Sequence, residues 1–339
     1  MPIRSCRPSP RGSSPNWRTA LSATSSTEDP AAEPRVIVVA GPTAAGKSAL
    51  GLAIAEEFNG AIINADSQQR YADLRILTSR PTQADEARIP HRLFGDLGPG
   101  EAGSAAEWAT KAAVEIRAAT AAGRLPILVG GTGLYFRALM EGLSDIPEVP
   151  MAVRHKARAL LDDIGNVAFH RGLAARDPAT AARLNPGDSQ RMLRAWEVLE
   201  ATGKSLAAWQ ETPGKPPLVA RYFSVVVMPP RADLYGACDA RFLAMVEGGG
   251  LAEVRALLAR GITLDAGAGK ALGVADLAAH LRGGVDLATA TTRGQTATRQ
   301  YAKRQMTWFR NQFNANLTIN EKFSESLFQK IFSNIRTFC

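Results

Sequence analysis

The chain is predicted to adopt an α/β fold in which helices flank a parallel sheet and an all-helical domain is inserted. Three observations predict it. Short apolar, β-branched runs alternate with helix-like segments. A glycine-rich loop joins the first such run to the first helix. Residues 144–217 carry a charged helical pattern, broken by proline and glycine, with no strand signal.

The glycine-rich loop follows a predicted strand over residues 36–39 and precedes a predicted helix over residues 48–58. It reads Gly41-Pro42-Thr43-Ala44-Ala45-Gly46-Lys47-Ser48. This sequence fits the P-loop pattern, in which backbone amides and a helix N-terminus bind a polyphosphate. Lys47 would add a positive charge, and Ser48 would hold Mg²⁺. The sheet is therefore expected to be P-loop NTPase-like. A tight turn kept for packing is the alternative, but such a turn does not need Lys-Ser.

Two further strands are predicted over residues 61–65 and 126–129, each ending at polar residues. Asp66 follows the first, and Gly130-Gly131-Thr132 follows the second. Ligands of parallel sheets bind at the carboxyl ends of the strands. We therefore expect the P-loop, Asp66 and Thr132 to meet in one crevice. Asp66 could act as a base or hold a magnesium-bound water, or it could simply cap a turn.

The rest of the core is predicted from capping and composition. Ser104 begins a helix that runs to about residue 122, with a glutamate at the capping-box position. Another strand is expected over residues 222–227, followed by helices up to residue 312. The predicted organisation is a disordered N-terminal arm at 1–34, a catalytic core at 35–143 and 218–313, the helical domain at 144–217, and a C-terminal tail at 314–339. In this tail alanine gives way to Asn, Phe, Ser and Lys, which suits a separate terminal helix or an appendage outside the fold. The arm is rich in Ser, Pro and Arg, and it also resembles an organelle transit peptide.

Composition limits the class of protein. The formal net charge is +8 and the pI is about 9.7, which suits an anionic partner such as nucleic acid but also an ordinary basic surface. No apolar run approaches the ~20 residues of a membrane span. The three cysteines are widely separated, which predicts a reducing compartment such as the cytoplasm. The four histidines form no metal-ligand pair.

Two segments carry basic side chains at helical spacing. Arg191 and Arg194 are three residues apart, so they share a helix face. Further on, Arg299 and Lys303 share a face of a later helix that also carries Tyr301 and other aromatic residues. Basic helices with interleaved aromatic residues can bind RNA. A solvated charged face with its aromatic residues in the core explains the same pattern.

Taken together, the motifs resemble the tRNA isopentenyltransferase (dimethylallyltransferase) family over about residues 36–312. Besides the P-loop, the resemblance is carried by Asp66-Ser67-Gln68-Gln69-Arg70-Tyr71, Pro90-His91-Arg92-Leu93, Leu128-Val129-Gly130-Gly131-Thr132-Gly133-Leu134-Tyr135, Gln190-Arg191-Met192-Leu193-Arg194 and Thr298-Arg299-Gln300-Tyr301-Ala302-Lys303-Arg304-Gln305. The order and spacing of these segments are far more specific than a P-loop alone.

The resemblance implies a particular chemistry. Members transfer a dimethylallyl group from dimethylallyl diphosphate to N6 of the adenosine just 3′ of the tRNA anticodon, and they are not ATPases. The P-loop with Lys47 and Mg²⁺ at Ser48 would hold the leaving diphosphate. Asp66 matches the family's general base, Thr132 a threonine of the channel, and Arg241 an arginine that helps to hold the diphosphate.

The resemblance also implies a tRNA-contacting set, a cytoplasmic location and a monomer, with tRNA and dimethylallyl diphosphate as partners. The tRNA-contacting residues would be Ser67, Gln68, Gln69, Arg154, Gln190, Arg191, Arg194, Lys270, Arg299, Lys303 and Arg304.

Some positions depart from the family pattern. Leu77-Thr78 stands where the family usually has Gly-Thr, and Val274-Ala275 falls in a segment that usually ends Gly-Tyr-Arg. Three alternatives stay open at the level of sequence. One is a P-loop kinase of nucleotides or metabolites. Another is an adenylate isopentenyltransferase that prenylates a free nucleotide. The last is a tRNA-binding relative without turnover.

Overall fold

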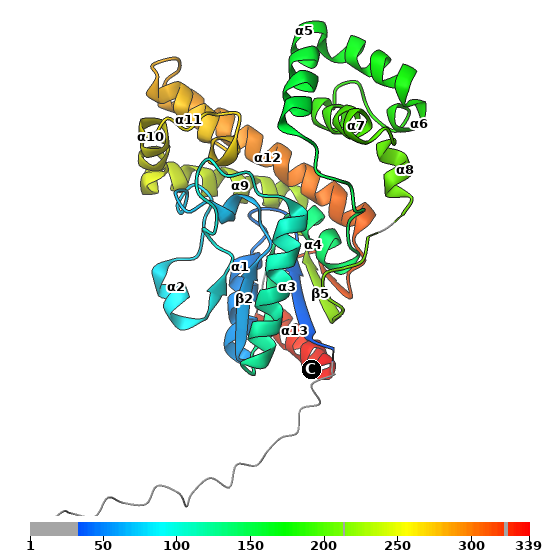
Figure 1. Ribbon diagram of the computed structural model, residues 1–339. Helices are drawn as coiled ribbons and strands as arrows, with labels where there is room; N and C mark the ends of the chain where they lie inside the picture. The colour runs from blue at the N-terminus through cyan, green and yellow to red at the C-terminus, as the bar shows by residue number, and fades with distance from the viewer. Residues whose placement is uncertain (1–32, 213, 322–324) are drawn as a thin grey trace, which may run out of the picture. The chain divides into compact units, whose positions relative to one another are not determined.

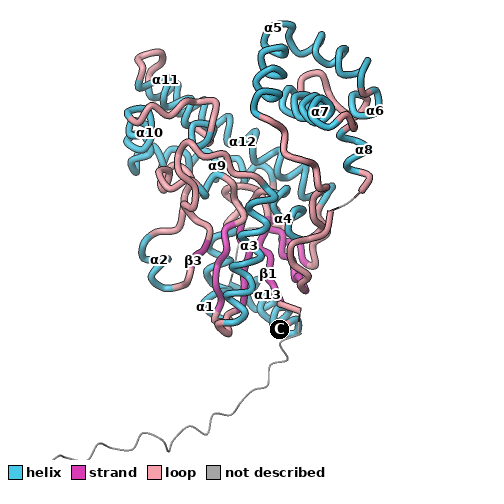
Figure 2. The backbone as a smooth tube through the Cα atoms, in the orientation of Figure 1, coloured by secondary structure: helices cyan, strands magenta, loops and turns pink. Residues whose placement is uncertain are grey.

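The computed structural model describes residues 33–212, 214–321 and 325–339. Residues 1–32 of the predicted N-terminal arm lie outside the described residues. The described chain contains a six-stranded sheet of strand order β3-β2-β4-β1-β5-β6 (Figures 1 and 2). Every pairing in it is parallel. The strands are β1 (Arg35–Ala40), β2 (Gly60–Asn64), β3 (His91–Arg92), β4 (Leu125–Gly130), β5 (Arg221–Val227) and β6 (Leu317–Ile319). The predicted parallel α/β fold is therefore confirmed.

Successive side chains of the central strands point to opposite faces of the sheet, and each face packs in its own apolar core. Val36 and Val38 of β1 face the core that also holds Trp108 and Phe309. This face is covered by α3 (Ala105–Ala121), α4 (Gly133–Met140), α9 (Arg231–Met245) and α12 (Leu287–Gln312). In the view of Figure 1, α3 lies over the sheet. Burial on both faces explains why the strands read as continuous apolar runs.

The opposite face of the sheet is covered by two helices from the two ends of the described chain. They are α1 (Lys47–Glu57) and α13 (Glu325–Phe338). Ile331 and Ile335 of α13 are fully buried against this face. The segment 314–339, expected as a tail, thus contains an edge strand of the sheet and a packed helix.

In the stretch predicted to be an inserted helical domain, all regular elements among the described residues are helices. Its elements are α5 (Met151–Arg176), α6 (Pro178–Ala181), α7 (Ser189–Thr202) and α8 (Leu206–Gln210). Gly165 has φ 72°, which breaks α5 into two helical pieces. These helices share their own apolar core, with Phe169, Leu173 and Met192 fully buried.

The remaining elements are short and lie between β2 and β3 or between α9 and α12 in the sequence. They are the short helices η1 (Gln68–Arg70) and α2 (Gln83–Arg88), the π-helical turn η2 (Val246–Gly250), α10 (Leu251–Ala259), η3 (Gly267–Lys270) and α11 (Val274–Leu281). The later ones enclose a third core with α9 and α12, in which Leu77 and Phe242 are buried. Among the described residues, no helix is long and apolar enough to cross a membrane.

Candidate active site

The phosphate loop joins β1 to α1, as its sequence predicts. Gly41 has φ +143° and lies so close to the end of β5 that a Cβ would sit 2.3 Å from the Val227 carbonyl oxygen. Gly46 has φ 92° and begins α1. Glycine is needed at both positions, because the first allows no side chain and both have φ values that side chains disfavour. The Lys47 ammonium group donates to the Pro42 carbonyl at 2.6 Å, across the loop.

A pocket of about 560 Å³ opens over this loop. It is lined by Ala44, Ala45, Gly46, Lys47, Ser48 and the side chain of Arg241. Burial lowers the pKa of Lys47 to about 8, an effect that the nearby Asp66 opposes and Arg241 reinforces. Arg241 comes from α9 and donates to the Thr43 hydroxyl. Its Nε is buried, with no hydrogen-bond partner among the described residues. A buried guanidinium nitrogen without a partner in the described chain, beside a P-loop and a lysine, fits a bound anion.

Asp66 lies directly after β2, where Asn64 fixes its backbone. The Asn64 side chain accepts from the Asp66 amide at 2.8 Å and donates to the Asp66 carbonyl at 3.0 Å. One carboxylate oxygen accepts from the Gln68 amide at 3.0 Å. The carboxylate is half-buried and lines a narrow cavity of about 30 Å³ together with Thr43, Arg241 and Tyr301. Arg241 lines both this cavity and the P-loop pocket, so the two are neighbours.

Thr132 lies directly after β4 and contacts the Asp66 segment. Its amide donates to the Ala65 carbonyl at 3.1 Å, and its hydroxyl accepts from the Ser67 amide at 2.9 Å. The structure therefore brings Thr132 beside Asp66, whereas the loop amides and Lys47 line the neighbouring pocket. The three strand ends are therefore neighbours, but they do not form the single expected crevice: Asp66 and the P-loop line two adjoining cavities, and Thr132 contacts the Asp66 segment from outside their linings.

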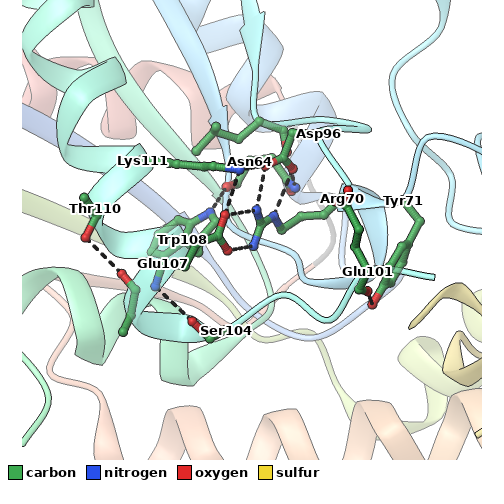
Figure 3. Close-up of polar contacts among 12 residues, drawn as sticks. Asn64, Arg70, Tyr71, Asp96, Glu101, Ser104, Glu107, Trp108, Thr110 and Lys111 are labelled. Atoms are coloured by element: carbon green, nitrogen blue, oxygen red, sulfur yellow. Dashed lines mark hydrogen bonds and ion pairs between the residues drawn. The ribbon is translucent and has the colours of Figure 1, made fainter. Parts of the chain in front are cut away.

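A charge network around the buried Arg70, which was not predicted from the sequence, lies next to the segment that follows Asp66 (Figure 3). The Arg70 guanidinium is fully buried and makes paired hydrogen bonds of 2.6–3.0 Å to Asp96 and Glu107. Lys111 contacts the same two carboxylates. Arg70 closes the helical turn that starts two residues after Asp66, so the network ties that turn to α3. No local motif could reveal it, since its acidic partners lie 26 and 37 residues away.

Tyr301 is a second residue that gained a role only in the structure. It lies on α12 and lines the narrow cavity together with Asp66 and Gln68. Burial raises the pKa of Tyr301, and the nearby Asp66 carboxylate adds to this rise. The side chain of Gln68 in turn accepts from the Leu272 amide at 2.9 Å. Polar side chains thus surround the Asp66 carboxylate and limit where a reacting group can sit.

The residues expected to contact tRNA divide into exposed and engaged groups. Gln190, Arg191, Lys270, Lys303 and Arg304 are exposed, whereas Arg154 and Arg194 are half-buried. Burial lowers the pKa of Arg194, an effect that Glu197 opposes and Arg154 reinforces. The Arg154 Nε is buried, with no partner in the described part of the chain.

Several members of the same expected set are engaged within the chain, and the exposed Arg191 also pairs with Asp188 at 3.5 Å. Arg299 pairs with Asp239 of α9 and also donates to the Thr296 hydroxyl. Gln69 donates to the carbonyls of Thr78 and Ser79 at 3.0 and 2.8 Å. Ser67 and Gln68 contact Thr132 and Leu272, as described above.

A P-loop beside a carboxylate, set on a parallel sheet with an arginine from a neighbouring helix, defines a phosphate-binding enzyme of α/β class. A sequence model of the family described as IPP transferase matches residues 69–312. This chain belongs to that family.

Relatives similar to this chain carry consistent names. A tRNA dimethylallyltransferase of Paramagnetospirillum magneticum is 54% identical over 300 residues, covering 88% of this chain and 95% of the relative. One of Rhodospirillum centenum is 56% identical over 288 residues, covering 84% and 91%.

Solved structures agree with the relatives. The tRNA isopentenylpyrophosphate transferase of Bacillus halodurans is 31% identical with a TM-score of 0.64, covering 90% of this chain and 96% of that one. A eukaryotic dimethylallyltransferase acting on tRNA is 26% identical with a TM-score of 0.73, covering 89% and 77%.

Proposed function

We propose that this protein is a tRNA dimethylallyltransferase. It transfers the dimethylallyl group from dimethylallyl diphosphate to N6 of the adenosine adjacent, on the 3′ side, to the tRNA anticodon, and it releases diphosphate. The observation that carries this proposal is the placement of the Asp66 carboxylate in a narrow cavity that shares Arg241 with the P-loop pocket. This arrangement supports a proton acceptor beside a diphosphate site, as the transfer requires.

In the proposed reaction, the bond between C1 of the dimethylallyl group and its diphosphate oxygen breaks, and a bond from N6 to C1 forms. The N6 proton passes to the Asp66 carboxylate. Lys47, Arg241 and the loop amides stabilise the negative charge that develops on the leaving oxygen. Such electrostatic stabilisation is usually the largest single contribution to catalysis. The adenine must leave its stack to reach the cavity.

The protein offers Mg²⁺ a limited set of ligands, and the set fits the proposed role. The described residues contain no group of three or more His, Cys, Asp or Glu that could hold a metal. Ser48 is exposed at the P-loop pocket. Mg²⁺ is commonly held by substrate phosphates, waters and one or two protein oxygens. Ser48 would hold the ion, which would supply charge neutralisation of the diphosphate.

For the acceptor, we propose that tRNA contacts the exposed Lys303 and Arg304 of α12, Lys270, and the face of α7 that presents Gln190 and Arg191. Arg154 adds to that second region a buried guanidinium nitrogen without a hydrogen-bond partner among the described residues, and the half-buried Arg194 adds a further positive charge. An unpaired guanidinium nitrogen favours an anionic partner such as a phosphate. We place the reaction in the cytoplasm, since Cys238 and Cys339 are free thiols.

The test is transfer of labelled dimethylallyl diphosphate to unmodified bulk tRNA with Mg²⁺, compared with AMP as acceptor and with ATP in place of the donor. We expect label in tRNA at the adenosine next to anticodons that read codons starting with U. Label only in AMP would instead identify a nucleotide prenyltransferase. Salt-sensitive tRNA binding without any transfer would identify a binding protein that lacks turnover.

A further inference from the structure

Gln305 is a buried amide that connects the two loops of the active site. It lies on the inner face of α12 and is 5% exposed. Its Oε1 accepts from the Thr43 amide of the P-loop at 2.8 Å. Its Nε2 donates to the Gly131 carbonyl, in the loop after β4, at 2.8 Å. One side chain from a third element thus joins the ends of β1 and β4.

The chemistry of the contact suits a primary amide. At any pH an amide offers an acceptor and a donor in one planar group, and here each atom meets its complement. Gly131, the residue that accepts from Gln305 Nε2, also has the residue type that this contact needs. A Cβ at Gly131 would lie 2.3 Å from Gln305 Nε2 and 3.0 Å from the Gly41 carbonyl oxygen. The missing side chain at Gly131 is what lets the amide and the two loops approach.

Each loop held by Gln305 carries part of the reaction site. On the P-loop side, the Thr43 hydroxyl accepts from Arg241, which lines the diphosphate pocket. On the other side, Thr132 follows Gly131 and fixes the Ser67 amide beside Asp66. The two hydrogen bonds of the Gln305 side chain therefore help to fix the distance between the P-loop, where the diphosphate would bind, and the segment that carries Asp66.

We infer that Gln305 is a positioning residue for the prenyl donor, an assignment that rests on the proposed function. It engages the Thr43 amide, which leaves the later amides of the loop for the diphosphate, and it holds the P-loop in register with the Asp66 segment. Its loss lets the loop move relative to Arg241 and Asp66. Donor binding suffers first, because the cradle amides must converge on one anion.

The test compares Gln305→Met, which keeps the side-chain volume but removes both hydrogen bonds, with Gly131→Ala, which displaces the amide from the other side. Binding of inorganic diphosphate with Mg²⁺ is measured by calorimetry, tRNA binding by filter retention, and steady-state kinetics on the full chain. We expect about tenfold weaker diphosphate binding and a similar rise in donor KM for both variants, with tRNA affinity within about twofold of wild type; tenfold corresponds to 1.4 kcal/mol.

A matched control comes from Asn316, whose side-chain amide accepts from the Ser224 amide of β5 at 2.8 Å. Asn316→Leu should lower the melting temperature without weakening diphosphate binding. The inference is overturned if Gln305→Met and Gly131→Ala bind diphosphate like wild type, or if diphosphate and tRNA affinities fall together in step with the melting temperature. Should Gln305→Met fail to fold, Gly131→Ala decides alone. Wild-type protein that binds no diphosphate would instead refute the proposed function itself.

Discussion

At the scale of single residues, Lys47 is the group whose charge state matters most for donor binding. Burial holds the pKa of its ammonium group at about 8, below its ordinary value. Below pH 8 the side chain is therefore charged, and above pH 8 it is largely neutral. A diphosphate beside it favours the charged form, so binding above pH 8 must bring a proton to Lys47.

We therefore expect donor affinity to fall as the pH rises through about 8, and binding at pH 8.5 to take up most of one proton. Calorimetry in two buffers with different ionisation enthalpies measures this uptake. Lys47→Arg is the control, because arginine stays charged throughout and should abolish the uptake. An affinity that stays constant up to pH 9, with no proton uptake in wild type, would contradict the placement of Lys47 against the diphosphate.

Asp66 is expected to act in the chemical step and not in tRNA binding. Asp66→Asn keeps an oxygen that can accept from the Gln68 amide, so the local turn should survive. Loss of a general base typically costs 10²–10⁴-fold in rate. We expect single-turnover transfer to slow by about that factor, while the dissociation constant for tRNA changes by less than about twofold. A parallel loss of tRNA affinity would remove the general-base assignment.

At the scale of elements, the short helix η1 depends on the buried Arg70 network for its position. Hydrogen bonds to Arg70 lower the pKa of Glu107 to about 2. Removing one partner of a buried ion pair commonly costs ~3–5 kcal/mol, since the remaining charges lose their compensation. Here Asp96 and Glu107 are 17% and 37% exposed and keep Lys111, which reduces the loss.

For Arg70→Met we therefore expect the free energy of unfolding to fall by ~2–3 kcal/mol, measured by urea denaturation. Arg88→Met is the matched control: Arg88 pairs with Glu56 on the surface, where a pair contributes about 0–1 kcal/mol. Equal losses in the two variants would show that the buried network does not stabilise the turn.

The acid sensitivity of this network has a defined direction. Because the pKa of Glu107 is lowered from 4.5 to about 2 on folding, its contribution is full above pH 4.5 and is lost as the pH falls toward 2. Glu107→Gln should therefore narrow the difference in stability between pH 5 and pH 3. An unchanged difference between these two pH values would mean that Glu107 gains no such interaction on folding.

Helix α12 carries buried side chains that face the catalytic loops and basic side chains that face solvent. Tyr301 and Gln305 point inward to the catalytic loops, whereas Lys303 and Arg304 are exposed. Arg299 lies between these groups and pairs with Asp239. Helical spacing alone predicts the basic face, but it cannot tell which arginine is free, because Asp239 lies 60 residues away.

This difference predicts how tRNA binding should respond to salt. Each phosphate contact contributes about 0.7–0.9 to the slope of log affinity against log salt. Lys303→Ala with Arg304→Ala should weaken tRNA binding and flatten that slope by about one to two. Arg299→Ala should leave the slope nearly unchanged, since its charge is already compensated by Asp239. A slope that flattens in Arg299→Ala but not in the double variant would reverse these roles.

At the scale of the whole molecule, the sequence predicts the strands that are long and fully buried. The expected runs at 36–39, 61–65, 126–129 and 222–227 all lie within or against β1, β2, β4 and β5. Strands β3 and β6 have only two and three residues, so no periodicity could identify them. Their pairing with neighbouring strands defines them, and that information is not local.

The same distinction separates the predicted site residues from the missed ones. The P-loop, Asp66 and Thr132 sit in contiguous motifs at strand ends, so topology alone brings them together. Arg70 and Gln305 act through partners far away in the sequence. Their residue types give no signal, because a buried arginine or glutamine is recognised only by what satisfies it.

The C-terminal helix α13 packs on the sheet although its composition differs from that of the preceding chain. That difference suited either a separate terminal helix or an appendage outside the fold. Yet Ile331 and Ile335 are one helical turn apart and both fully buried on the sheet face opposite α3, α4 and α12. This core reaches Ala45 and Leu52, which line the P-loop pocket, but among the described residues α13 itself lines neither that pocket nor the Asp66 cavity. We therefore expect α13 to contribute to stability and not directly to substrate binding.

We expect Ile331→Ala to lower the free energy of unfolding by ~2–5 kcal/mol, because it removes buried methyl groups and leaves a cavity under the sheet. Lys330→Ala, one residue earlier on the exposed face, should change it by less than about 0.5 kcal/mol. Well below its melting temperature, Ile331→Ala should bind diphosphate as wild type does, as calorimetry can show. Weaker binding at such a temperature would mean that packing on the far face of the sheet reaches the strand ends, and that the cradle depends on the whole sheet and not on its own loops.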